Sequence, residues 1–136
     1  DKHLLPLKTS VLKTIAVIGD NATRMNHLGG FGAGVKAKYE ITPLEGLQNA
    51  FGKNVNIKFA QGYHAALNDK HVDVNKPDSI LIQDAVNAAK NSDVAILFIG
   101  GNRDYESEGR DRKDLSLPFG EQALVEIIAF IFIFLN

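Results

Sequence analysis

Short apolar runs alternate along the chain with segments of helical periodicity. The run TIAVIG at 14–19 is β-branched and uniformly apolar, which is typical of a parallel strand buried on both faces. DVAILFIG at 93–100 is more hydrophobic still and predicts another buried strand. In NVNIKFAQG at 54–62, apolar and polar side chains alternate from Val55 to Phe59. This alternation predicts a strand near the edge of a sheet.

The segment ITPLEGLQNAFG at 41–52 carries the boundary signals of a helix. Thr42 can cap its first turn, in which Pro43 is well tolerated. Glu45 completes a capping box, because its side chain can reach back to the capping residue. Gly52 is suited to end the helix.

Two further segments are expected to be helical. DSILIQDAVNAAKNS at 78–92 begins with Asp78 as a candidate N-cap, and PFGEQALVEIIA at 118–129 forms the other. The first of them has an apolar stripe at helical spacing. The stripe consists of Ile82, Ala85, Val86 and Ala89.

Nine consecutive apolar residues, Ile127 to Leu135, precede the last residue, Asn136. A transmembrane helix needs about 20 such residues, so we interpret this run as part of the core. Its last portion, FIFIFL at 130–135, is expected to be a final strand. A partnerless apolar end would be prone to aggregation.

The predicted elements follow the order β-α-β-α-β-loop-α-β, and 63–77 is expected to be a loop. Such alternation predicts a single α/β domain over 1–136, with a mostly parallel sheet and helices on both faces. Ligands of such sheets bind outside the carboxyl ends of the strands. We therefore expect the loops after 14–19 and after 93–100 to face one crevice.

Composition excludes several classes of partner. With 15 basic and 16 acidic residues, the net charge of −1 gives no electrostatic case for nucleic acid or an anionic membrane. Cysteine is absent, which excludes disulfides and thiolate chemistry. The first residues, DKHLLPLKTS, do not have the pattern of a signal peptide and suggest a chain that begins midway through a protein. The compartment stays open.

The glycine-rich segment LGGFGAG at 28–34 has three interpretations. From Gly32 to Ala37 it fits a loose dinucleotide fingerprint, but that fingerprint must start at a strand end and open a helix. Here it begins thirteen residues after Gly19, and the next helix starts near Thr42. The alternatives are a flexible loop, or glycines that leave Phe31 free to pack on a sugar ring.

The loop after 93–100 is the other candidate for chemistry. Its carboxylates could supply a general acid, whose pKa must be raised by burial or by nearby negative charge. Arg110 and Arg112 could order the loop through ion pairs. Taken alone, such a cluster is most often a solvated surface. The carboxylates are those of Asp104, Glu106, Glu108, Asp111 and Asp114.

Other catalytic signals are weak. The four histidines show no metal-binding spacing, so we expect no metal site. Ser107 does not lie in a G-x-S-x-G elbow. We also expect no cofactor.

Several segments, in order, resemble the C-terminal α/β sandwich domain of glycoside hydrolase family 3, the family of β-glucosidases and β-xylosidases. They are LLPLKTSVLKTIAVIGDNA, LGGF, TPLEGL, AVNAAKNSDVAILFIGG and EGRDRKDLSLPFGEQALVEII. The resemblance covers Leu4 to about Ile128. Its most specific part is the E-G-x-D-R stretch, with the following L-x-L-P and Q.

The resemblance implies a retaining mechanism with two carboxyl groups. Members typically place an aspartate nucleophile on a (β/α)8 barrel, and the sandwich domain lends a glutamate as general acid/base. Glu108 matches that glutamate, because Gly109, Asp111 and Arg112 fix the register, and Glu106 is the alternative.

Two other sites follow from the resemblance. Phe31 matches a place where some relatives put an aromatic ring beside the sugar. Arg110, Asp111 and Arg112 would order the acid/base loop. The substrate would be a β-linked glycoside or oligosaccharide.

The chain also departs from the family pattern. The barrel and its nucleophile are absent, and AFIFIFLN replaces the later elements, so we interpret the chain as a truncated domain that is inactive alone. Its partner would be the missing barrel. A non-catalytic sugar-binding or partner-packing module is the competing hypothesis, and a nucleotide-binding half-domain is a third.

Overall fold

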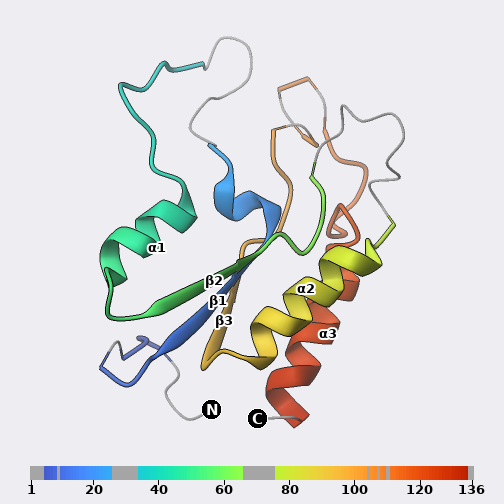
Figure 1. The fold of residues 1–136 in the computed structure, drawn as a ribbon. Coiled ribbons are helices and arrows are strands. Elements are labelled where there is room, and N and C mark those ends of the chain that lie inside the picture. Colours follow the sequence, from blue (N-terminus) through green and yellow to red (C-terminus); the bar gives the residue numbers. More distant parts are fainter. Residues whose placement is uncertain are drawn as a thin grey trace.

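A computed structural model of the chain describes residues 5–8, 10–25, 34–65, 76–103, 105–106, 108–109 and 111–134. Strands and helices alternate along these segments (Figure 1). The elements are β1 (Thr14–Ile18), the 3-10 helix η1 (Asp20–Thr23), α1 (Pro43–Phe51), β2 (Asn56–Ala60), α2 (Ser79–Lys90), β3 (Val94–Leu97) and α3 (Glu121–Phe134).

The described strands form one parallel sheet in the order β2-β1-β3. Ile15 of β1 is in register with Ile57 of β2 and with Val94 of β3. Residues 15–18 are wholly inaccessible to solvent, because β1 is central and covered on both faces. The predictions of a doubly buried first strand and of an edge position for 54–62 are confirmed.

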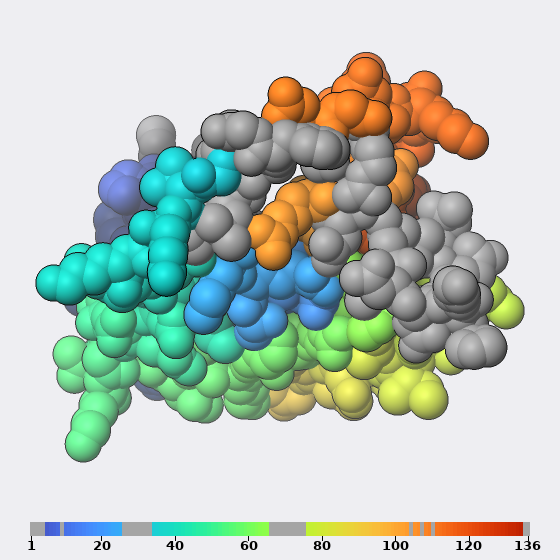
Figure 2. Space-filling view, turned by 90° about the horizontal axis from the view of Figure 1, so that it is seen from above, coloured from blue at the N-terminus to red at the C-terminus, as the bar shows by residue number. Residues whose placement is uncertain are grey.

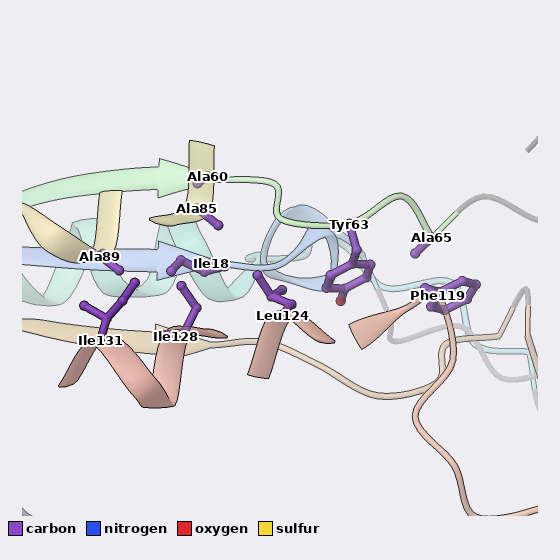
Figure 3. Close-up of a cluster of buried hydrophobic side chains, with 11 residues drawn as sticks. Ile18, Ala60, Tyr63, Ala65, Ala85, Ala89, Phe119, Leu124, Ile128 and Ile131 are labelled. Atoms are coloured by element: carbon purple, nitrogen blue, oxygen red, sulfur yellow. The ribbon is translucent and has the colours of Figure 1, made fainter. Parts of the chain in front are cut away.

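Helices cover both faces of the sheet, as predicted (Figure 1). On one face, Ile15 and Val17 belong to a cluster that includes side chains of α1. On the other, Ala16 and Ile18 belong to a larger cluster with α2 and α3. Figure 3 shows this second cluster, in which Ile18 of β1 lies beside Ala85 of α2 and Ile128 of α3. Because successive side chains of β1 point to opposite faces of the sheet, this one strand contributes to both clusters.

Local signals set the boundaries of α1 as predicted. The Thr42 hydroxyl accepts a hydrogen bond from the Glu45 backbone N–H at 3.3 Å. The Glu45 carboxylate accepts one from the Thr42 N–H at 2.8 Å, which completes the capping box. Gly52, with φ of 58°, ends the helix.

The second predicted helix is confirmed as well. The Asp78 carboxylate caps α2 by accepting from Ile80 N at 2.9 Å and from Leu81 N at 3.1 Å. Ala85 and Ala89 of the predicted stripe are fully buried. Their small side chains let α2 lie close to the sheet and to α3.

The prediction of a last strand at 130–135 is wrong. The described part of this run continues α3 to Phe134 without a break. Leu124, Ile128 and Ile131 lie on one side of the helix and are buried against α2 and the sheet. A run that is apolar at every position has no distinguishing period, so tertiary packing decided between helix and strand.

Candidate functional site at the strand ends

The carboxyl ends of β1, β2 and β3 meet at one edge of the sheet, because the strands are parallel and adjacent. Figure 2 shows the molecule from the side of the loops that leave this edge, with residues 20–25 in blue and the loop after β3 in orange. The predicted Phe31 lies outside the described residues, and a crevice shared by its loop and the loop between β3 and α3, here called the charged loop, stays a prediction.

Two buried asparagines join the loops that follow all three strands. The Asn21 side chain donates to the Gly100 carbonyl at 2.9 Å. The Asn102 side chain donates to Asn21 Oδ1 at 3.3 Å and to the Ala65 carbonyl at 3.4 Å. Polar groups buried this deeply must be hydrogen-bonded, so this network fixes the loops relative to one another.

The Asp20 carboxylate joins the loop after β1 to the loop after β2. It forms an ion pair with Arg24 at 2.7 Å. The same carboxylate accepts from Gln61 Nε2 and from the Ala65 N–H, both at 3.2 Å. Gln61 Nε2 also lies 3.2 Å from His64 Nδ1. Sequence reasoning did not single out this cluster.

Glu121 is a buried acid at the first position of α3. Its side chain has no solvent exposure, and both carboxylate oxygens accept from the Gly100 N–H, at 3.1 and 2.9 Å. Burial raises its pKa to about 7, although the Gly100 N–H and the neighbouring Tyr63 hydroxyl act to lower it. Sequence reasoning placed Glu121 in a helix but gave it no role.

Tyr63 lies between Glu121 and the strand ends. Its hydroxyl donates to the Phe98 carbonyl at 2.7 Å and accepts from the Asn21 N–H at 3.2 Å. Burial raises the pKa of this phenol above its usual value. Its ring stacks on Phe119 with centroids 6.0 Å apart, at the loop end of the core (Figure 3).

The charged loop lies above this buried layer. Glu108 and Asp111 are exposed, and Glu106 forms an ion pair with Arg112 at 3.4 Å. These four residues line one open hollow of about 500 Å³. The structure therefore brings Glu106, Glu108, Asp111 and Arg112 together, while Arg110 lies outside the described residues.

The end of the loop is held by a local turn. The Asp114 carboxylate accepts from the Ser116 backbone N–H at 2.8 Å and from its hydroxyl. These hydrogen bonds lower the pKa of Asp114 below its usual range. Asp114 is thus held as an anion, which does not suit a proton donor.

In the described segments, no group of three or more histidine or acidic side chains could hold a metal ion. No helix among them has both the length and the apolar character needed to cross a bilayer.

Sequence comparison with known proteins matches the chain to one family model and to relatives of the same kind. The model of the glycosyl hydrolase family 3 C-terminal domain matches residues 1–131. A β-glucosidase of Bacteroides ovatus is 37% identical over 92% of this chain, and a β-xylosidase of Formosa agariphila is 34% identical over 94% of it. The chain spans 17% of the length of each.

Structural comparison agrees with the sequence matches. The crystal structure of a family 3 β-glucosidase from Bifidobacterium adolescentis matches with a TM-score of 0.75 and 31% identity. The match covers 95% of this chain and 17% of that enzyme. By the family model, the sequence relatives and the fold together, this chain belongs to glycosyl hydrolase family 3 and corresponds to its C-terminal domain.

Proposed function

We propose that this chain is part of a retaining β-glycosidase, of the β-glucosidase or β-xylosidase type, and that it contributes the loop carrying the general acid/base. The observation that carries the proposal is the hollow at the strand ends, where Glu106 and Glu108 are presented beside Arg112. Glycoside hydrolysis with retention needs two carboxyl groups, one of which gives and then takes a proton.

Glu108 is the proposed acid/base. Glu106 is already engaged by the Arg112 guanidinium at 3.4 Å, which holds its carboxylate within the loop. Glu108 is exposed on the same hollow and can face a neighbouring domain. Arg112, with Arg110 and Asp111, is assigned the ordering of the loop, and Phe31 is assigned contact with the sugar.

The nucleophile is proposed to come from a (β/α)8 barrel outside this chain. The chain spans 17% of its relatives, so a partner domain of that kind is available in proteins of their length. A general acid needs a raised pKa, which burial supplies. An exposed Glu108 would obtain that burial when a barrel covers the loop, and the chain by itself would therefore be inactive.

The test measures the hydrolysis of p-nitrophenyl β-D-glucoside and β-D-xyloside by two proteins. One is the full-length protein, in which residues 1–136 are joined to the proposed barrel, and the other is residues 1–136 alone. We expect the full-length protein to cleave at least one substrate and to release the β-anomer first, as followed by proton NMR, and residues 1–136 to give no turnover. Release of the α-anomer first would exclude a retaining mechanism. Turnover by residues 1–136 that is lost in Glu108→Gln would show that no barrel is needed.

A further inference from the structure

The two ends of the charged loop, which we call its stems, are in contact with each other. It begins at Gly100, shortly after β3 ends at Leu97, and ends where α3 begins at Glu121. Both carboxylate oxygens of Glu121 accept from the Gly100 N–H, at 3.1 and 2.9 Å, so one buried side chain joins the two stems. The intervening residues include Glu106 and Glu108.

Aromatic packing supports the same junction. The Tyr105 ring, just inside the first stem, meets the Phe119 ring edge-on with centroids 5.5 Å apart. Phe119 also stacks on Tyr63, so the second stem is fixed to the core. The two stems are therefore joined by one polar and one aromatic contact.

The turn before α3 aims Glu121 inward. Phe119 and Gly120 both have positive φ, of 58° and 69°. A Cβ on Gly120 would lie 2.8 Å from the backbone nitrogen of Pro77, so only glycine fits at this position. An unusual backbone of this kind persists where the surrounding structure enforces it.

The hydrogen bond from Gly100 to Glu121 requires a carboxyl group to be buried, which costs desolvation free energy. Burying a carboxylate without a basic partner is unfavourable. Within the described part of the chain, the groups that act on its pKa besides burial are the Gly100 N–H and the Tyr63 hydroxyl, and neither is a cation. An apolar residue at this position would avoid the cost but could not accept from Gly100.

We propose that Glu121 is a positioning residue for the acid/base loop, which it holds by accepting the hydrogen bond from Gly100 across the two stems. This inference rests on the proposed function of the loop. Glu121 does not contact substrate in this role. Instead, it fixes the position of the Glu108 carboxyl group when a substrate is bound.

A misplaced general acid has a specific kinetic signature. Glycosides with poor leaving groups need a proton from the acid in the first chemical step, whereas 2,4-dinitrophenyl glycosides do not. A variant with a misplaced acid loses kcat/KM on the first kind of substrate and keeps it on the second. A variant that is merely less folded loses both equally.

The experiment measures kcat/KM of the full-length enzyme on methyl and 2,4-dinitrophenyl β-glycosides. We expect Glu121→Ala to lose about tenfold or more on the methyl glycoside, by partial loss of general acid catalysis, and to stay within about twofold on the dinitrophenyl glycoside. Glu121→Gln, which keeps an acceptor for Gly100, should recover most of the loss. Glu126→Ala, at an exposed glutamate of the same helix, is the matched control.

The outcomes separate this inference from the proposed function. Equal losses on both substrates in Glu121→Ala, or no recovery in Glu121→Gln, would overturn the positioning role. If Glu108→Ala and Glu106→Ala both lack the leaving-group signature, the proposed function of the loop fails instead. If Glu108→Ala shows that signature and Glu121→Ala does not, only the role of Glu121 is wrong.

Discussion

Burial gives Glu121 a chemistry that its sequence context does not reveal. An acid at the start of a helix is ordinarily a solvated partner of the helix dipole. Here the turn at Phe119 and Gly120 directs it into the core, where its pKa is raised to about 7. The sequence could not predict this, because the contact with Gly100 joins residues twenty-one positions apart.

The raised pKa of Glu121 makes the stability of the fold depend on pH. The folded state holds the proton up to about pH 7, whereas the unfolded chain releases it near 4.5. The folded state therefore binds more protons between these values, and stability falls as pH rises through that window. We expect the free energy of unfolding to fall by on the order of 2 kcal/mol between pH 5 and pH 8 on account of this group.

Urea unfolding of residues 1–136 and of Glu121→Gln at both pH values measures this term. The variant should lack the decrease, and a parallel decrease in both proteins would contradict the assignment. Asp93 and Asp114 do not interfere, because backbone and side-chain hydrogen bonds lower their pKa values. Their contribution is lost only at more acidic pH, as their carboxylates are protonated.

At the scale of secondary structure, the sequence predicted an element correctly where all the residues that define it lie close together in the chain. The capping box of α1 and the Asp78 cap of α2 were readable because their partners lie within three residues. The strands were readable from their apolar runs. The tail of α3 was not, because nine apolar residues in succession carry no period, and the helix is distinguished only by its packing against α2 and the sheet.

The capping box provides a test of helix stability in α1. No residue of this helix is fully buried, so we expect the loss of its N-terminal cap to be measurable. We expect Thr42→Ala to lower the free energy of unfolding by about 1 kcal/mol, through loss of the bond to the Glu45 N–H. Asn49→Ala, at an exposed position of the same helix, should change it by less than about 0.5 kcal/mol. Equal effects in urea unfolding would contradict the capping role.

At the scale of the whole molecule, the contacts that shape the candidate site gather at one edge of the sheet. The Asn21–Asn102 network, the Asp20 cluster and the Glu121 contact all lie where the strands end. The charged loop contacts this polar layer and, through Tyr105 and Phe119, the hydrophobic core. Its position was predictable from the parallel order of the strands, whereas the buried groups beneath it depend on contacts between distant segments.

The most direct test of the acid/base role is azide rescue in the full-length protein, with p-nitrophenyl β-D-glucoside as substrate. We expect Glu108→Ala to lower kcat by about 100-fold or more, and added azide to restore turnover with formation of the β-glycosyl azide. Azide can attack the glycosyl-enzyme without a general base, so rescue identifies the missing group. Unchanged turnover in Glu108→Ala, together with rescue in Glu106→Ala, would move the role to Glu106. No effect in either variant would show that this loop does not carry the acid.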